Sequence, residues 1–425
     1  MADKYSKTLD FGNGDKYHML PLVTSENDGM LLKVTNGEWG AGYIIPPSPK
    51  TYIVKIDQNN SDPLACCTYE GDAVGMTKGS DAWDEIFGYK PCLLSTDEPH
   101  QVVYLNPNDF SRDIDGNDVS SIITSGMIDS ITFVDVMIEF PRLAINIEND
   151  GNGVITVSMS TDIGVFGNDS LDSRAFGTRD KIYLGAYLCN NPGNTQTLVS
   201  RSGVEPVVNI NLSDSIIYAQ NRGSGYDIMG FYQWTYVQCL YLLKYGNLNS
   251  QVALGQGYVN GNEKQNTGVT NTQGMCYGNT TSGTDRVKLF GLEDAWGNLL
   301  QWLGGLYCDS SSNLHTKTTK FTAEITASDY DFSTPLSLSE DPLNGYMEQL
   351  QGTNGGGFIG KQTGGSSSTY WSDGGYISLD GGSFANVGGS LTYGDGAGLF
   401  FYNVRHDAYY YDDYLGSRLM YLSPD

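Results

Sequence analysis

Charged residues, histidines and long apolar runs are all scarce in this sequence. Only 17% of the 425 residues are charged, and no HExxH, GxSxG or Walker motif occurs. The usual signatures of zinc proteases, serine hydrolases and P-loop enzymes are therefore missing. No run of about 18 apolar residues is present, so we expect no membrane-spanning helix. The four histidines are dispersed along the chain, at His18, His100, His315 and His406.

Positive charge is particularly scarce. The chain has 24 Lys and Arg against 49 Asp and Glu, a formal net charge of -25. Such a chain repels phosphate backbones and anionic lipid headgroups, so we expect neither nucleic acid nor a membrane among its partners. The residues from Met1 to Tyr5 lack the apolar stretch of a secretion signal. We therefore expect synthesis in a cytosol and transport by something other than the secretion pathway.

Cysteine pairs of the CxxC type are also absent. An odd number of widely spaced cysteines predicts reduced, mostly buried thiols, with a disulfide framework or a zinc site as the alternatives. We expect no bound metal or cofactor that serves catalysis, although a structural ion stays open. The seven cysteines are Cys66, Cys67, Cys92, Cys189, Cys239, Cys276 and Cys308.

Glycine (53 residues) and tyrosine (29) are abundant, and the length predicts two or three domains. In residues 1–49, turn signals at 11–14 and 26–29 separate short alternating stretches, which predict a small β module ending in the stiff linker 46–49. Residues 50–141 predict a second, β-rich domain, and residues 142–425 a third.

One strand is clearly patterned. Between Val134 and Phe140, apolar residues alternate with Asp135 and Glu139, which predicts a half-buried strand that Pro141 ends.

Two helices are expected in the third domain. The first has its N-cap at Ser213–Ser215 and ends by Gly223, and the second runs from Phe231 to Tyr245 with Gly246 as its stop. Beyond Gly246 the helical spacing disappears and glycine pairs separate short apolar pieces. We therefore predict an α+β fold, with N-terminal β modules before a domain of two helices and irregular, loop-rich β structure.

Several motifs of the third domain occur in a recognisable order. Glu293-x-x-Trp296-Gly-Asn298-x-x-x-Trp302 is followed by Gly388-Gly389-Ser390 and by Gly416-x-Arg418. This order resembles the formylglycine-generating-enzyme branch of the C-type-lectin-like fold, in the form that tail proteins of gut bacteriophages use. Upstream segments, including 28–39, 104–110 and 135–139, also resemble such phage proteins. The resemblance covers nearly the whole chain and implies a C-type-lectin-like ligand-binding domain over 142–425.

In that family, the stretch between Gly-Gly-Ser and Gly-x-Arg is often the variable region of a diversity-generating retroelement, which rewrites adenines in AAC asparagine codons. Here that region is 390–414. We expect a scaffold made by Ala397, Gly398, Leu399, Phe400, Val404, Ala408, Leu415 and Gly416. The candidate ligand-binding residues, all but Arg405 one adenine change from asparagine, are Thr392, Tyr393, Asp395, Tyr402, Arg405, His406, Tyr409, Tyr410, Tyr411, Asp412, Asp413 and Tyr414.

Tyrosine suits a recognition surface because it buries a large area while few rotamers are lost. The alternative is an aromatic core, but adjacent tyrosines alternate faces on a strand and cannot all point inward. Trp296, Trp302 and Asn298 are expected to fix the core and a turn, and Arg418 to donate to backbone carbonyls. The sugar-binding motifs of calcium-dependent lectins are absent, which disfavours a sugar-ligating calcium site.

The related oxidase uses a late pair of reactive cysteines, and this chain has none after Cys308. We therefore expect no enzyme, although a paired-carboxylate glycosidase stays open. The resulting hypothesis is a homotrimeric receptor-binding protein in the virion, attached to other phage tail proteins and contacting a bacterial surface receptor, either glycan or protein. The alternatives are a structural tail-fibre or baseplate subunit and a capsule depolymerase.

Overall fold

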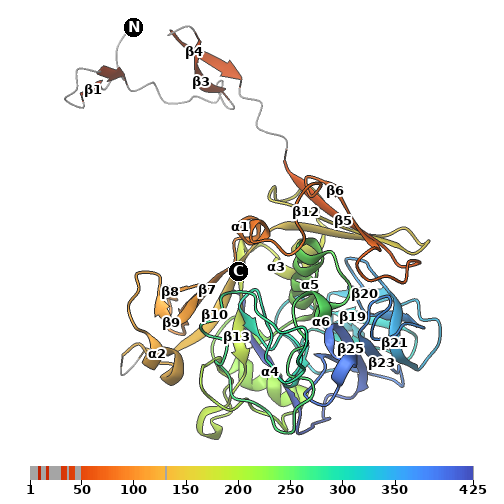
Figure 1. Ribbon diagram of the computed structural model, residues 1–425. Coiled ribbons are helices and arrows are strands. Elements are labelled where there is room, and N and C mark those ends of the chain that lie inside the picture. The colour runs from red at the N-terminus through yellow and green to blue at the C-terminus, as the bar shows by residue number, and fades with distance from the viewer. Residues whose placement is uncertain are drawn as a thin grey trace. The chain divides into compact units, whose positions relative to one another are not determined.

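The computed structural model describes residues 8–10, 16–18, 30–35, 38–43, 49–129 and 132–424. The chain divides into two compact units, Met1–Pro49 and Lys50–Asp425. The predicted turns at 11–14 and 26–29, and the linker up to residue 48, lie outside the described residues. In the first unit, two antiparallel pairs are formed by β1 (Thr8–Asp10) with β2 (Lys16–His18) and by β3 (Met30–Thr35) with β4 (Glu38–Tyr43) (Figure 1).

The fold is mostly β, and the predicted α+β class is wrong. Strands account for 34% of the residues and helices for 15%. Both predicted helices are present, as α4 (Leu212–Gln220) and α5 (Phe231–Tyr245). Within the described ranges, no helix is long and apolar enough to cross a bilayer. The remaining α-helices have six residues or fewer: α1 (Ala82–Phe87), α2 (Ser120–Ser125), α3 (Leu171–Phe176) and α6 (Ser250–Ala253).

The first large sheet of the second unit joins distant parts of the chain. Tyr183 is in register with Tyr421 near the C-terminus, while Ile182 is in register with Phe140. Residues on both sides of position 141, where the sequence suggested a boundary, therefore share one sheet. Its strands, in spatial order, are β14 (Tyr226–Ile228), β27 (Arg418–Tyr421), β13 (Lys181–Leu188), β10 (Val134–Pro141), β7 (Lys90–Ser95), β8 (Val102–Asn106) and β9 (Asp109–Asp113).

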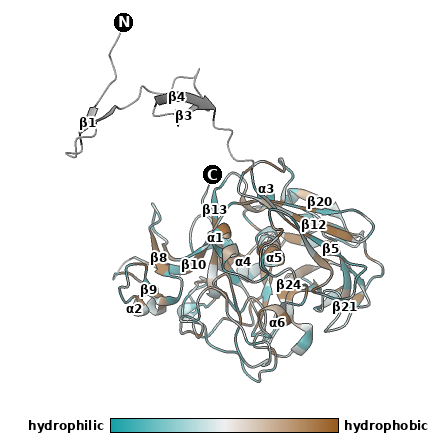
Figure 2. Ribbon diagram, turned by 45° about the horizontal axis from the view of Figure 1, so that its top comes forward, coloured by the Kyte–Doolittle hydropathy of each residue, from teal (hydrophilic) through white to brown (hydrophobic). Residues whose placement is uncertain are grey.

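Two further sheets complete the framework. The four-stranded sheet consists of β11 (Ala144–Asn149), β12 (Val154–Ser160), β5 (Thr51–Asp57) and β6 (Cys67–Gly71). Strand β5 buries Tyr52, Val54 and Ile56, and its hydrophobic residues can be followed in Figure 2. The other seven-stranded sheet, in spatial order, consists of β22 (Gly360–Thr363), β21 (Leu343–Leu350), β23 (Gly374–Ile377), β25 (Gly398–His406), β24 (Phe384–Gly388), β17 (Leu300–Trp302) and β26 (Leu415–Gly416).

Two smaller β elements are also present in the described part of this unit. One is three-stranded, with β18 (Leu306–Cys308), β19 (Asn313–Thr316) and β20 (Phe332–Pro335). The other is the short pair β15 (Lys288–Leu289) and β16 (Leu292–Glu293).

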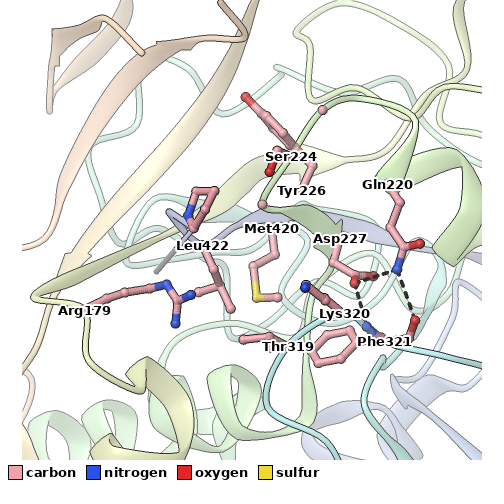
Figure 3. A pocket seen from close by; sticks show the side chains of 13 residues that line it. Arg179, Gln220, Ser224, Tyr226, Asp227, Thr319, Lys320, Phe321, Met420 and Leu422 are labelled. Atoms are coloured by element: carbon pink, nitrogen blue, oxygen red, sulfur yellow. Dashed lines mark hydrogen bonds between the residues drawn. The ribbon is translucent and has the colours of Figure 1, made fainter. Parts of the chain in front are cut away.

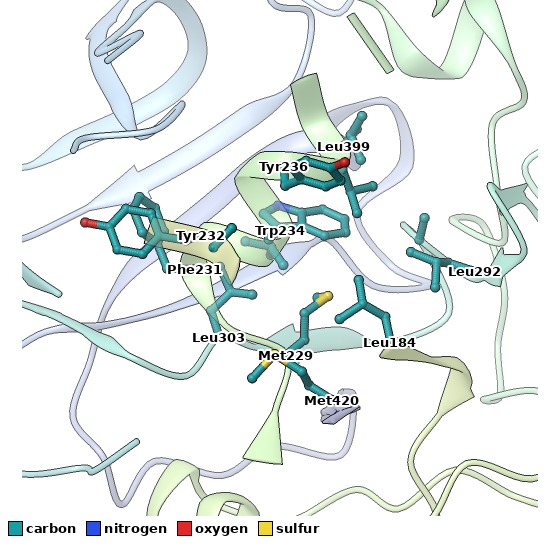
Figure 4. Packing of buried hydrophobic residues seen from close by; sticks show 14 of the residues in the cluster. Leu184, Met229, Phe231, Tyr232, Trp234, Tyr236, Leu292, Leu303, Leu399 and Met420 are labelled. Carbon is teal, nitrogen blue, oxygen red and sulfur yellow. The ribbon is translucent and has the colours of Figure 1, made fainter. Parts of the chain in front are cut away.

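Helix α5 lies in the middle of the second unit, with all of its fifteen residues buried. A helix that is covered on every side lies inside a protein core. Gln238 donates to the carbonyl of Leu399 in β25 (2.9 Å), and Tyr236 donates to the carbonyl of Pro141 in β10 (2.8 Å). Figure 4 shows Trp234 among hydrophobic side chains that come from several strands. The sheets therefore pack around α5.

Strand β10 confirms the predicted strand, but the half-buried pattern is wrong. Asp135 is fully buried and Glu139 nearly so. Arg222 Nε lies 2.7 Å from Asp135 Oδ2, and Lys181 Nζ lies 2.8 Å from Glu139 Oε2. From their polarity alone, both carboxylates are expected to face solvent. Ion pairing allows them to be buried instead.

The cysteines are free thiols, as predicted: six are buried and Cys276 is partly buried. Burial raises the pKa of the Cys189 thiol to about 12, so this sulfur stays protonated at neutral pH.

Candidate functional site

The candidate surface 390–414 is built around strand β25. This strand lies between β23 and β24, with Tyr402 in register with Gly375 and Val387. The eight predicted scaffold residues are all buried, which confirms that part of the prediction. A central strand with both neighbours paired is held by two hydrogen-bond ladders, so its ends are fixed. Three candidate residues precede this strand (Thr392, Tyr393 and Asp395), three lie within it (Tyr402, Arg405 and His406), and the other six follow it.

Most of the candidate residues reach solvent. Tyr409 is 73% exposed and Tyr411 is 65% exposed. Thr392, Asp395, Arg405 and Asp413 are also exposed, and the half-buried members are Tyr393, His406, Tyr410, Asp412 and Tyr414. Tyr402 is different, because it is only 2% exposed and its hydroxyl lies 3.3 Å from Gln238 Oε1 of α5. Its side chain is part of the core.

The tyrosine-rich segment 407–414 is a loop that hydrogen bonds hold at several points. Asp407 Oδ1 accepts from the amide of Tyr409, and Asp412 Oδ1 accepts from the amide of Tyr414, each at 2.8 Å. The carbonyl of Ala408 accepts from Ser213 of α4, and that of Tyr414 accepts from Leu300 of β17. The aspartates therefore shape the loop and do not only face solvent.

Asn209, which the sequence analysis did not single out, also supports this loop. The backbone N–H of Asn209 donates to the carbonyl of Asp412 (3.1 Å), and its side-chain Nδ2 donates to Asp413 Oδ1 (2.6 Å). Asn209 has a φ of 55°, a conformation that asparagine adopts more readily than most residues. This backbone preference of asparagine does not reveal that the side chain contacts Asp413, about two hundred residues later in the chain.

An aromatic stack stiffens the base of the loop. The rings of His406 and Tyr410 lie 3.6 Å apart at 10° to each other, and the Tyr410 hydroxyl donates to Asp412 Oδ2 (3.2 Å). Burial, followed by the neighbouring charge of Arg405, lowers the pKa of His406 to about 4. His406 is therefore uncharged at neutral pH and acts there as a hydrogen-bonding ring.

Two tyrosines outside 390–414 join the surface. The Arg405 guanidinium lies 4.9 Å from the ring centre of Tyr376 on β23. Tyr346 on β21 is half-buried, and burial together with the charge of Asp395 raises the pKa of its hydroxyl. The local sequence does not indicate either residue, because β21 and β23 come close to β25 only through strand pairing in their shared seven-stranded sheet.

Two buried asparagines lie on the neighbouring strands β24 and β25. Asn386 of β24 and Asn403 of β25 are in register, and each is 1% exposed or less. Asn403 Nδ2 lies 3.2 Å from His406 Nε2. Within the described residues, both side-chain polar atoms of Asn386 and the Oδ1 of Asn403 have no hydrogen-bond partner. These groups provide unused hydrogen-bonding capacity close to His406.

The residues expected to fix the core and a turn are buried, as predicted. Trp296, Asn298 and Trp302 are fully buried, and Asn298 adopts a positive φ of 59° in a turn. The buried Arg418 donates to the carbonyls of Gly185 (2.8 Å) and Glu293 (2.6 Å). These contacts tie β27 to β13 and to the motif itself.

Across the described part of the chain, no group of three or more His, Cys, Asp or Glu side chains is placed to hold a metal ion.

No family model matches the chain, and no curated protein matches it. Several solved chains match, among them one named Major Tropism Determinant M1 Variant, whose match covers 92% of this chain and 78% of that chain at 10% identity, with a TM-score of 0.30. Because that score is low, we base no conclusion on this similarity. The lectin-like resemblance of the sequence stays a prediction.

Proposed function

We propose that this chain is a receptor-binding protein of a bacteriophage tail, which presents the surface 390–414 to a molecule on the bacterial envelope. The observation that carries this proposal is the exposure of Tyr409 (73%) and Tyr411 (65%) on a loop that is otherwise fixed by hydrogen bonds. Large aromatic side chains are normally buried, and exposed ones on a stiff support bind partners at small entropic cost.

The composition of the surface fits reversible, non-covalent binding. Tyrosine rings provide contact area, whereas Asp395, Asp413 and Arg405 add directional polar contacts at its edge. The exposed side chains of Tyr409 and Tyr411 lie outside the buried part of β25, so we expect their substitution to leave that strand in place. This property is what a retroelement-diversified region requires.

The wider proposal has four parts: the chain is not an enzyme, the first unit attaches it to other tail proteins, three copies assemble in the virion, and several weak sites act together through avidity. The oligomeric part is tested by sedimentation of the full chain, and a monomer at micromolar concentration would contradict it.

The central test is binding of the full chain to envelope preparations from a panel of bacteria. The double variant Tyr409→Ser with Tyr411→Ser should reduce binding to a responsive envelope at least about tenfold, since central aromatic side chains dominate interface energies. Tyr410 is left intact because its stack on His406 supports the loop. Val74→Ser, at a residue that is 68% exposed elsewhere in the unit, is the matched control and should bind like the parent chain.

Other outcomes distinguish the alternatives. If no envelope binds the chain while particles still incorporate it, the structural tail-subunit function replaces the proposed one. If envelopes release reducing sugars on incubation with the chain, the depolymerase function replaces it. If the encoding gene has a near-identical template repeat that differs only at adenines, the retroelement part of the proposal is supported.

A further inference from the structure

The cavity beside β14 and β27, with a volume of about 640 Å³, offers little to a ligand (Figure 3). Phe321 and Met420 line it but are only 4% and 1% exposed, so these side chains present no apolar face. The buried Asp227 accepts from Gln220 Nε2 (3.1 Å) and from the backbone N–H of Phe321 (2.9 Å), as the dashed lines show. The groups of this cavity therefore satisfy one another.

A smaller hollow, with a volume of about 260 Å³, has accessible groups of both kinds. Val269 in its wall is 57% exposed, and Tyr258 and Tyr277 are half-buried. The volume lies just below the range of about 300–1,000 Å³ that drug-sized ligands occupy, so it suits a single small ring. The other residues of the wall are Gln265, Thr270, Gln273, Thr284, Asp285 and Arg286.

Two residues of the sequence motif, Glu293 and Asn298, hold the walls of this hollow. The Glu293 carboxylate accepts from the backbone N–H groups of Gly268 (2.7 Å) and Thr270 (2.8 Å). Asn298 Oδ1 accepts from the backbone N–H of Gln265 (2.9 Å), and Asn298 Nδ2 donates to the Gln265 carbonyl (3.1 Å). The wall is therefore fixed before a ligand arrives, which lowers the entropic cost of binding.

The charges of the hollow disfavour an anion. The Arg286 guanidinium is 7% exposed and is already paired with Asp294 and Glu293. Asp285 is partly exposed, and its Oδ2 accepts from Asn279 Nδ2 (2.6 Å), whereas its Oδ1 accepts no hydrogen bond within the described residues. A carboxylate with a free oxygen accepts hydroxyl groups and repels other anions.

The remaining groups suit a hydroxylated ring. The exposed Gln273 amide and the Tyr277 hydroxyl make no hydrogen bond in the described part of the chain. A pyranose has apolar C–H faces and a rim of hydroxyls that both donate and accept, so it matches this set of groups. We propose that the hollow binds a neutral hexose. Its C–H face packs on Tyr277 and Val269. Its hydroxyls hydrogen-bond to the Gln273 amide and the Asp285 carboxylate.

The hollow adjoins the surface 390–414 through one loop. The carbonyl of Gly283, next to Thr284 in the wall, accepts from the backbone N–H of Val259 (2.8 Å). The carbonyl of Val259 in turn accepts from the backbone N–H of Gly394 (3.0 Å). A short oligosaccharide therefore reaches both places. This step, in which the hexose belongs to the receptor, rests on the function proposed above, whereas hexose binding itself does not.

The test is saturation-transfer difference NMR of the full chain with the methyl glycosides of glucose, mannose and galactose, and with sodium glucuronate as the anionic ligand. We expect at least one neutral glycoside to bind, with transfer to its ring C–H protons, and glucuronate to bind several-fold more weakly. The inference is overturned if none of the three glycosides binds or if glucuronate binds equally well.

Variants locate the sugar in the hollow. Gln273→Ala removes an exposed side chain that the fold does not use, and it should weaken binding of the glycoside about fivefold. Tyr277→Leu, which keeps an apolar side chain but loses the ring, should weaken binding at least as much. Gln101→Ala, at another exposed glutamine, is the matched control and should bind like the parent chain. Equal affinities of Gln273→Ala and Gln101→Ala would show that the sugar is not held as proposed.

The hexose site and the proposed function fail separately. The double variant Tyr409→Ser with Tyr411→Ser should bind the glycoside as the parent chain does, and loss of binding there would move the sugar from the hollow to the surface 390–414. The glycoside in excess should also reduce binding of the parent chain to a responsive envelope. If envelope binding is unaffected by a glycoside that occupies the hollow, the hexose is not part of the receptor.

Discussion

At the scale of single residues, Arg418 is the clearest case of a role that the sequence predicts. Its place in the terminal Gly-x-Arg segment predicts a structural role. Arg418 is fully buried, and it donates to three backbone carbonyls and to Gln301 Oε1. Burial lowers the pKa of Arg418 to about 10, which still leaves it charged at neutral pH. The planar, five-donor guanidinium satisfies acceptors from several segments at once.

Replacing this guanidinium with a single ammonium should be costly. Arg418→Lys leaves at least one buried carbonyl unpaired, and we expect the free energy of unfolding to fall by about 3 kcal/mol. Arg405→Lys, at an exposed arginine of the other seven-stranded sheet, should change the free energy of unfolding by less than about 0.5 kcal/mol. Urea denaturation of both variants measures the difference, and equal midpoints would show that the carbonyl contacts contribute little.

Tyr402 shows the limit of residue-level prediction. The residue types that predict a variable position do not show which side of a strand the side chain occupies. On β25, the alternate residues Phe400 and Tyr402 face α5, where Phe400 packs on Tyr241 and Tyr402 reaches Gln238. Arg405 lies beyond this buried stretch and reaches solvent. The side that is covered depends on a helix about 160 residues earlier, which local spacing does not reveal.

At the scale of elements, the sequence predicts where a helix or strand lies in the chain better than it predicts what packs against it. Helix α5 has the predicted bounds, because Gly246 ends it in the left-handed conformation with a φ of 48°. Its complete burial was not predicted, since the cover comes from three separate sheets. Similarly, β10 was placed correctly, but the partners of Asp135 and Glu139 lie on other elements. The alternation of apolar and polar residues along a strand does not reveal ion pairs with distant parts of the chain.

Helix α4 begins earlier than its sequence suggested. Its N-cap is Asn211, whose Oδ1 accepts from the amide of Asp214 (2.8 Å), and not one of Ser213–Ser215. We expect Asn211→Ala to lower the free energy of unfolding by about 1 kcal/mol, whereas Ser213→Ala should have little effect. Thermal melts followed by circular dichroism compare the two. A larger loss for Ser213→Ala would contradict this assignment of the cap.

At the scale of the whole molecule, the fold class was mispredicted because it depends on long-range pairing. Short, glycine-separated pieces after residue 246 indicated irregular structure, and only their pairing partners organise them into sheets. Parallel pairs such as β23 with β25 and β17 with β26 leave no turn signature, since their strands are not joined by hairpins. The same long-range pairing also affects which segments of the chain fold as one domain.

Residues 50–425 should unfold as one cooperative unit. Strand β27, next to the C-terminus, pairs with β13, which pairs with β10, so the first sheet is complete only when both ends of this unit are present. A protein of residues 50–425 should therefore show one calorimetric transition, close to that of the full chain. A protein of residues 142–425 exposes the edge of β13 and part of the cover of α5, and we expect it to aggregate or to lose its near-ultraviolet circular dichroism signal. Two resolved transitions for residues 50–425, or a soluble and well-ordered 142–425, would show that residue 141 is a true domain boundary after all.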